Sequence, residues 1–169
     1  MKSNRSSGFT LVELLVVMVI IAILSGLLLS AIGAVRNAAM RQKGNTMAKL
    51  MASAYSDFYN RYGYWPMSPT NTYWSTSGTR SVDSNCLAML QTEGNTNNIN
   101  FLQAITTKLS TNTTGELIDP WGNVYQATVD KTNGMRGSVS PSVTGAGVLQ
   151  TGVAVWSTNS SGECKTKSW

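Results

Sequence analysis

The chain has 169 residues, a formal net charge of +5 from 13 basic and 8 acidic side chains, and no histidine. The missing histidine removes the commonest general base and the commonest metal ligand from any candidate site. The basic residues form no run, so the composition indicates no nucleic-acid-binding patch. Once a hydrophobic N-terminal segment is set aside, roughly 130 residues remain, which is enough for one small domain.

The N-terminal segment is apolar from Phe9 to Val35, with Glu13 as its only charged residue, and a short basic leader over residues 1–8 precedes it. At ~1.5 Å per residue the apolar run makes a helix of about 40 Å, which exceeds the ~30 Å hydrocarbon core of a membrane. The sequence therefore predicts a membrane-spanning helix over residues 9–35. We expect the basic leader to stay in the cytoplasm, which places the rest of the chain on the periplasmic or exterior side.

Glu13 is the unusual residue of this segment. A carboxylate near the end of a spanning helix carries a desolvation cost and needs a partner. If the chain is cleaved between Gly8 and Phe9, the new α-amine of Phe9 is a cation that Glu13 can pair with, most usefully on a neighbouring copy. We expect one copy alone to hold Glu13 imperfectly satisfied, and a stack of copies to satisfy each Glu13 in turn.

The leader and the residues that follow it, Gly8-Phe9-Thr10-Leu11-Val12-Glu13, resemble the class III signal of type IV pilins and type II secretion pseudopilins. The resemblance implies cleavage after Gly8 by a prepilin peptidase, N-methylation of Phe9, and polymerisation through the helix with Glu13 as the assembly residue. It also implies an inner-membrane location before assembly. The partners it implies are other copies of the chain, the peptidase and methyltransferase, an inner-membrane assembly platform and minor pseudopilins.

Two other interpretations of the segment compete with this one. An ordinary secretory signal would be cleaved near Ala31-Ile32-Gly33, but the apolar run is long for such a signal. A plain single-pass anchor fits the length of the run. Neither interpretation accounts for Glu13.

The helix is expected to continue beyond the membrane over residues 36–63. An apolar face recurs at steps of three and four residues, which is typical of an amphipathic helix; it consists of Met47, Leu50, Met51, Ala54, Phe58 and Tyr62. Gly44 is a candidate soft point between the two halves. Gly63 suits the helix end, and Pro66 bars continuation.

Residues 64–169 are expected to form the globular domain, which begins in a cluster of aromatic residues, Tyr62-Gly63-Tyr64-Trp65-Pro66. We interpret this cluster as a buried hinge rather than a ligand platform. Residues 67–80 read as a loop, in which Tyr73 and Trp74 could be anchors. Asp83 or Ser84 can cap a short helix through about Thr92. Residues 94–98 suit a turn, and residues 99–109 a further helix or extended segment.

The last third of the chain reads as antiparallel β-structure. Residues 124–129 suit a strand, residues 131–134 with Asn133-Gly134 suit a type I′ hairpin turn, and residues 135–139 suit the returning strand. Residues 148–157 read as the final strand, and a polar tail follows. The fold class predicted is α+β, with the long N-terminal helix packed on a small antiparallel sheet.

Residues 119–125, Asp-Pro-Trp-Gly-Asn-Val-Tyr, are similar to the Asp-Pro-Trp-Gly-Asn-Pro-Tyr signature of the major pseudopilin of type II secretion, with Val124 in place of Pro. We interpret Asp119, Pro120, Trp121 and Gly122 as a structural turn, in which Asp119 accepts backbone N–H groups and Trp121 is an apolar anchor. The resemblance favours a structural subunit of a secretion pseudopilus that drives protein export. The alternative is a major or minor type IV pilin that serves adhesion, motility or DNA uptake.

The other candidate sites are weak. Cys86 and Cys164 could form a disulfide in an oxidising compartment or remain two separate thiols, and their spacing does not decide between these. Major pseudopilins bind calcium in the C-terminal loop, but Glu163 is the only carboxylate after Val153, so we expect no calcium and no other cofactor. No constellation of nucleophile, base and acid is recognisable, so we expect no enzyme activity.

Overall fold

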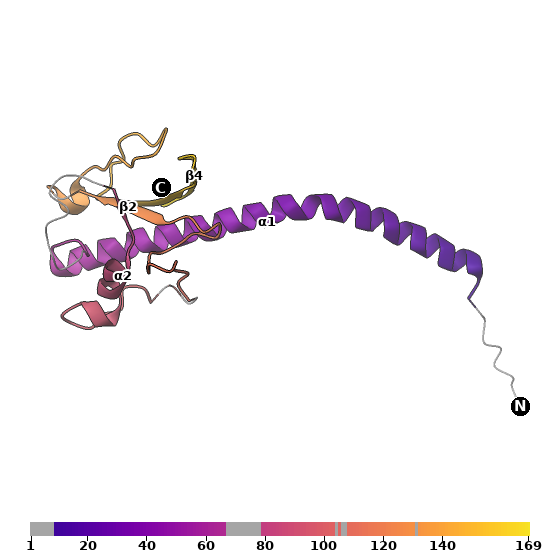
Figure 1. Ribbon diagram of the computed structural model, residues 1–169, viewed down its shortest axis with the longest axis horizontal. Coiled ribbons are helices and arrows are strands. Elements are labelled where there is room, and N and C mark those ends of the chain that lie inside the picture. Colours follow the sequence, from indigo (N-terminus) through magenta and orange to yellow (C-terminus); the bar gives the residue numbers. More distant parts are fainter. Residues whose placement is uncertain (1–8, 67–78, 104, 106–107, 131) are drawn as a thin grey trace, which may run out of the picture. The chain divides into compact units, whose positions relative to one another are not determined.

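The computed structural model describes residues 9–66, 79–103, 105, 108–130 and 132–169, apart from the side chains of residues 29–31 and 93. The chain divides into two compact units, residues 1–39 and residues 40–169. Helix α1 (Leu11–Tyr62) contributes its first part to one unit and its second part to the other (Figure 1). The helix predicted from residue 10 to residue 62 is therefore confirmed.

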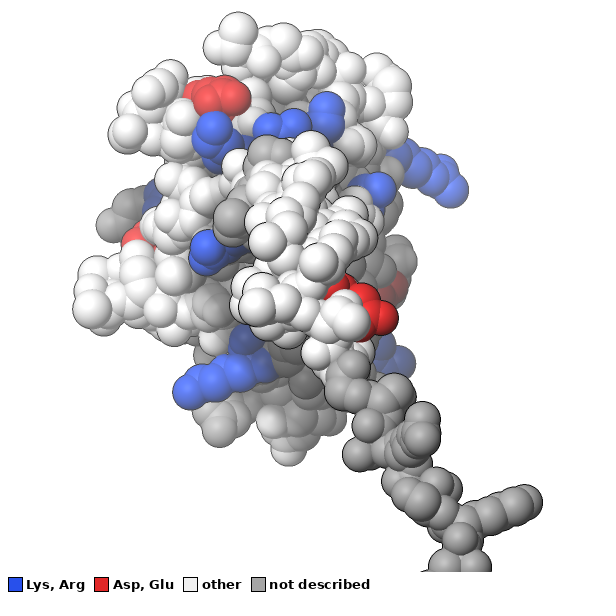
Figure 2. Space-filling model, turned by 90° about the vertical axis from the view of Figure 1, so that its right-hand side faces the viewer, with Lys and Arg blue, Asp and Glu red and all other residues white. Residues whose placement is uncertain are grey.

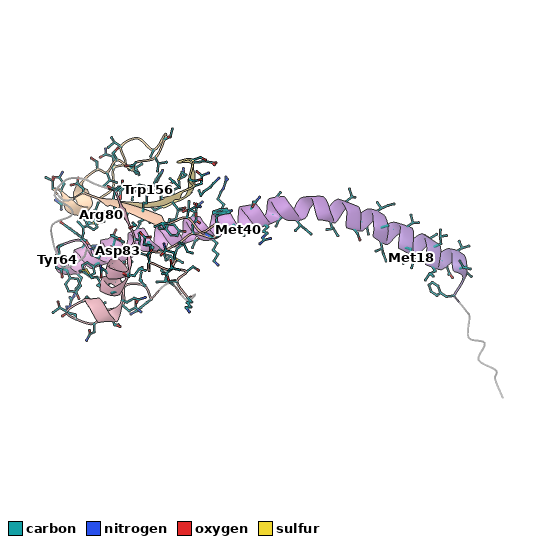
Figure 3. All side chains as sticks on the ribbon, in the orientation of Figure 1. Met18, Met40, Tyr64, Arg80, Asp83 and Trp156 are labelled. Atoms are coloured by element: carbon teal, nitrogen blue, oxygen red, sulfur yellow. The ribbon has the colours of Figure 1, made fainter. Side chains whose placement is uncertain are left out.

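The first unit is the apolar part of α1. Its large side chains are exposed, as Figure 3 shows around Met18, which has an exposed fraction of 64%. The best window of α1 has a mean hydropathy of 3.0, and by length and composition the helix can cross a membrane. Such a surface is stable only against lipid or against other apolar helices.

The second unit contains the amphipathic part of α1. Met51, Ala54 and Phe58 of the predicted apolar face are buried, and so are Ala48 and Tyr55. These side chains form the main hydrophobic core together with buried residues of the sheet and of the short helix that follows. The 3.6-residue period of the sequence thus identified the buried face of the helix.

Helix α1 ends as the sequence predicts. Gly63 adopts a left-handed φ of 76°, and its N–H donates a hydrogen bond of 2.7 Å to the carbonyl of Tyr59. A glycine adopts this conformation without the steric cost that a side chain would bring. The predicted buried hinge is confirmed for Trp65 and Pro66, which are buried, with Trp65 Nε1 donating to the carbonyl of Asp130 at 2.8 Å, whereas Tyr64 is exposed.

Gly44 is not the soft point that we expected. The helix runs through it without interruption, and its carbonyl accepts a hydrogen bond of 2.9 Å from the hydroxyl of Tyr125. A Cβ atom at this position would overlap Cγ2 of Thr166 and would lie 3.4 Å from Cδ of Pro120. The glycine therefore allows the sheet and the Pro120 turn to approach the helix backbone closely.

In the described residues, four antiparallel strands form one sheet in the order β1-β2-β3-β4 (Figure 1). They are β1 (Arg80–Ser81), β2 (Tyr125–Val129), β3 (Val153–Thr158) and β4 (Cys164–Lys167). β2 and β3 confirm two predicted strands, although β3 begins later than expected. β1 was predicted as the end of a loop, and β4 was predicted as part of a polar tail.

Strand β3 is buried on both faces. Val153 and Val155 belong to the core beneath α1, whereas Ala154 and Trp156 belong to a second cluster on the opposite face. Trp156, labelled in Figure 3, is fully buried there and meets the ring of Trp169 at 6.2 Å between centroids. The C-terminal residues are thus part of the packed structure.

The predicted hairpin over residues 131–134 is wrong. Residues Gly134–Arg136 form the 3-10 helix η2, and residues 135–139 do not return along β2, which pairs with β1 and β3 instead. The physical reason is Asp130, whose carboxylate accepts backbone N–H bonds from Thr132, Asn133 and Ser138 at 2.8–3.0 Å. These bonds hold residues 132–138 around the Asp130 carboxylate, and their stabilisation outweighs the preference of Asn133-Gly134 for a type I′ turn.

The short helix α2 (Ser84–Leu90) begins as predicted, because the carboxylate of Asp83 accepts the N–H of Cys86 at 2.8 Å. A 3-10 helix, η1 (Thr92–Gly94), follows. The predicted helix or strand at residues 99–109 is absent from the described part of that range, which is turn and loop. The predicted loop residues 67–78, including Tyr73 and Trp74, lie outside the described residues.

Candidate functional site at the start of helix α1 and the Asp119 turn

The start of α1 is a reciprocal cap formed by Thr10 and Glu13. The Thr10 N–H and hydroxyl donate to Glu13 Oε2 at 2.9 and 2.8 Å, and the Glu13 N–H donates to Thr10 Oγ1 at 3.3 Å. This is the capping-box arrangement, whose Thr-x-x-Glu pattern is readable in the sequence although we did not use it. A single copy therefore gives Glu13 more hydrogen-bond partners than we expected.

The cap holds the Glu13 carboxylate close to Phe9, the residue at which the chain would begin after cleavage. Phe9, which would carry the new amine, directly precedes the Thr10 N–H that bonds to Glu13. Phe9 is 77% exposed, and Glu13 is also exposed. A carboxylate at this point also lies at the positive end of the helix dipole. Gly8, the predicted cleavage residue, lies outside the described residues.

The second candidate site is the turn at Asp119, which holds its shape through one carboxylate. Asp119 Oδ1 accepts the backbone N–H of Trp121 at 2.9 Å and that of Asn123 at 2.8 Å. The Asn123 amide donates to Asp119 Oδ2 at 3.0 Å. Gly122 completes the turn with a φ of 87°. The predicted backbone-binding role of Asp119 agrees with these contacts.

Asp119 also ties the turn to the sheet, which the sequence did not reveal. Its side chain is 3% exposed, and its Oδ2 accepts a hydrogen bond of 2.6 Å from Ser157 Oγ on β3. Ser157 Oγ lies 2.8 Å from Thr166 Oγ1 on β4. Tyr125 on β2 reaches Gly44 of α1, and burial raises the pKa of its phenol to about 12. We call the set Gly44, Asp119, Tyr125, Ser157 and Thr166 the Asp119 cluster.

Trp121 does not serve as the apolar anchor that we expected. Its side chain is 37% exposed at the tip of the turn. Pro120 provides the contact with the helix instead, because it lies against Gly44. The turn is therefore held by the hydrogen bonds of Asp119 and by Pro120, and it leaves Trp121 partly exposed.

Cys86 and Cys164 are free thiols in the structure, which is one of the two alternatives that the sequence left open. Cys86 is buried in the main core, with its sulfur 2.7 Å from the hydroxyl of Tyr55. Cys164 packs against the second cluster, on the opposite face of the sheet, and its thiol donates to the carbonyl of Thr166 at 3.2 Å. Burial raises the pKa of the Cys86 thiol to about 12.

Two polar side chains of the C-terminal loop between β3 and β4 are held by donors of the loop itself. Asn159 Oδ1 accepts the backbone N–H groups of Ser161 and Glu163 at 3.1 and 2.8 Å, and the Glu163 carboxylate pairs with Lys165 at 2.7 Å. Asn159 Oδ1 and the Glu163 carboxylate therefore already have donors within the loop. Among the described residues, no three His, Cys, Asp or Glu side chains gather around a common point.

Comparison with known proteins agrees with the N-terminal site. Residues 3–29 match the family model described as the prokaryotic N-terminal methylation motif. No curated protein and no solved structure gives a significant match to the chain. The chain therefore carries a prepilin-type N-terminal signal of the type IV pilin-like class, ahead of a long helix that packs on a small antiparallel sheet.

Proposed function

We propose that this protein is a structural subunit of a type II secretion pseudopilus. Prepilin peptidase cleaves it after Gly8, its new N-terminus at Phe9 is methylated, and copies polymerise through the apolar part of α1. The observation that carries the proposal is the Thr10–Glu13 cap at the start of an exposed apolar helix, within the matched methylation motif. The extending fibre drives substrates toward the outer membrane.

Assembly in this proposal moves the apolar helix from lipid into a bundle of identical helices. Both surroundings bury the apolar side chains, so the transfer itself contributes little free energy. The Phe9 amine of a neighbouring copy adds a cationic partner to a Glu13 carboxylate that Thr10 already orients. An ion pair between the cationic amine and the carboxylate in a water-poor bundle is stronger than the bonds that the uncharged donors of Thr10 give to the same carboxylate.

The Asp119 turn favours the secretion pseudopilus over a type IV pilus, because it follows the major pseudopilin signature closely in sequence. The pilus remains the second candidate, since the N-terminal motif is common to both. The two are distinguished by deleting the gene: the secretion subunit is required for export of the cargo, and the pilus subunit for surface fibres and adhesion or motility.

Variants of the cap test the assembly role. The protein is expressed with its assembly system, and sheared fibres are quantified by electron microscopy. Glu13→Gln keeps an acceptor for Thr10 but removes the charge, and we expect it to abolish fibres as Glu13→Ala does. Thr10→Ala removes the hydroxyl contacts of the cap but keeps the backbone N–H bond and the charge, and we expect fibres to form.

Membrane insertion is the control for these variants. All three should resist extraction by carbonate as the wild type does, because the apolar run is unchanged. Fibres of normal length and abundance from Glu13→Gln would refute the pairing of Glu13 with the neighbouring amine.

We also propose that the domain folds without calcium, because Asn159 and Lys165 fasten the C-terminal loop. Addition of excess chelator should leave the melting temperature of the purified protein unchanged. A marked fall that calcium reverses would contradict this.

A further inference from the structure

Basic side chains gather where the second unit begins. Arg41 and Lys43 are exposed on α1, just beyond the end of the apolar run at Val35. Lys43 and Lys108 line one small cavity of about 50 Å³, together with Asp119 and Pro120. Strand β4, which carries Lys165 and Lys167, lies beside this part of α1, because the backbone N–H of Lys167 donates to Asn45 Oδ1 at 3.0 Å. We call Arg41, Lys43, Lys108, Lys165 and Lys167 the basic patch.

The patch keeps a net positive charge. Among the described residues, Glu163 is the exposed carboxylate beside the patch. Its negative charge is largely offset by Lys165 at 2.7 Å. Lys165, and to a smaller extent Arg41, lower the pKa of Glu163. Figure 2, a face of the molecule seen from the right-hand side of Figure 1, shows Lys and Arg side chains at several places on the surface, with Asp and Glu side chains among them.

A second carboxylate beside the patch is Asp119, which lines the cavity of Lys43 and Lys108 but is buried, whereas other carboxylates of the second unit hold loops and caps of the fold. Asp83 caps α2, Asp119 is buried in its cluster, and Asp130 accepts three backbone N–H groups of its loop. Glu116 accepts hydrogen bonds from Asn112 and Thr114. With five basic side chains against Glu163 and the buried Asp119, the patch keeps a net positive charge that can attract an anionic partner.

The position of the patch along the chain identifies the chemistry of that partner. Arg41 and Lys43 follow Val35 by six and eight residues, which corresponds to about 9 and about 12 Å of helix. The headgroup region on each side of the hydrocarbon core is roughly 5–8 Å thick, and electrostatic attraction extends about 8–10 Å further. Phospholipid phosphates lie within this distance of a helix that spans the membrane through residues 9–35.

We propose that the basic patch binds anionic phospholipid headgroups while the subunit resides in the membrane. The patch combines four Lys side chains with one Arg, and both residue types bind phosphate groups. Leaving the membrane for a fibre then requires release of these lipids. The proposal rests on the membrane location given in the proposed function, and carbonate extraction of the same samples tests that location separately.

The experiment measures which lipid stays with the full-length mature chain. The protein is purified in mild detergent after equilibration with equal amounts of phosphatidylcholine and phosphatidylglycerol, and the retained lipids are quantified by mass spectrometry. The wild type should retain phosphatidylglycerol preferentially. Arg41→Gln/Lys43→Gln should lower this preference by about fivefold for each charge removed. Raising the salt from about 0.05 to about 0.5 M should weaken the wild-type preference.

The matched control is Arg61→Gln/Arg136→Gln, which removes the same charge from exposed positions outside the patch. It should keep the wild-type preference. Equal retention of both lipids by the wild type would overturn the proposal, and so would an equal loss in the patch and control variants. If the patch variant instead loses salt-sensitive association between copies while its lipid preference is unchanged, the partner is protein and the lipid proposal is wrong.

Discussion

Ser157 Oγ donates a hydrogen bond of 2.6 Å to Asp119 Oδ2, and so joins the central strand of the sheet to a turn 38 residues earlier in the chain. Both side chains are buried. The Asp119 carboxylate therefore holds the turn in place. The Ser157 hydroxyl also lies 2.8 Å from Thr166 Oγ1, so the same contacts include β4. A motif that reads as a local turn in the sequence is in fact the point where the turn, the sheet and α1 meet.

The first prediction concerns this bond. Asp119→Ala leaves the N–H groups of Trp121 and Asn123 without their acceptor, and it should lower the free energy of unfolding by about 3 kcal/mol. Ser157→Ala should cost about 1–2 kcal/mol, because Asp119 keeps its amide donors. Urea unfolding of the full chain in detergent, followed by tryptophan fluorescence, measures both values.

The double variant Asp119→Ala/Ser157→Ala is the control. Because the two groups interact directly, its cost should be smaller than the sum of the single costs by about 1 kcal/mol or more. Strictly additive costs would show that the bond contributes nothing in solution.

The second prediction concerns the close approach at Gly44. Gly44→Ala should destabilise the domain by about 1–3 kcal/mol, because its Cβ overlaps Cγ2 of Thr166 and this outweighs the better helix propensity of alanine. Adding Thr166→Ser removes that methyl group and keeps the hydroxyl that contacts Ser157. The double variant should recover most of the loss relative to Thr166→Ser alone. A Gly44→Ala variant as stable as the wild type would disprove the close contact.

The third prediction separates the two thiols. A maleimide reagent should leave Cys86 unmodified in the native protein, because the thiol is buried and its pKa of about 12 leaves almost no thiolate at neutral pH. The Cys164→Ser variant isolates Cys86 and should react only after unfolding.

Mass spectrometry of unreduced protein from an oxidising compartment should show two thiols, and a mass lower by two hydrogens would reinstate the disulfide.

The fourth prediction is a pH dependence from Asp130. Its hydrogen bonds from the backbone of Asn133, Thr132 and Ser138 hold the pKa of the carboxyl below its usual range. A carboxyl with a lower pKa in the folded state stabilises the fold above its unfolded pKa of about 3.9, and this contribution is lost as the pH falls through the folded value. Asp130→Asn should therefore melt below the wild type at pH 6. The difference should shrink as the pH drops below about 4, and a gap independent of pH would count against the assignment.

The regular elements that packing periodicity determines were predictable. The apolar run, the amphipathic face around Met51 and Phe58, the Gly63 end, the Asp83 cap and the strands at β2 and β3 follow from local patterns that tertiary structure reinforces. The reciprocal cap of Thr10 and Glu13 was also readable, since its spacing is a known pattern.

The rest depends on contacts between residues far apart in the sequence. Arg80–Ser81 is a strand only because β2 lies beside it, and Cys164–Lys167 is polar in sequence yet pairs with β3. The Asn133-Gly134 turn signal was overridden by the carboxylate of Asp130. The Asp119–Ser157 bond could not be predicted, because nothing local marks Ser157 as the partner of a distant turn.

The central claim is that the chain matures at Phe9 and polymerises with Glu13 paired to a neighbouring N-terminus. Its most direct measurement is the intact mass and N-terminal sequence of subunits sheared from fibres of the wild type. We predict a chain that begins at Phe9 and carries one N-methyl group. A subunit that begins at any other residue, or a protein that stays unassembled where its assembly system builds fibres, would contradict the account.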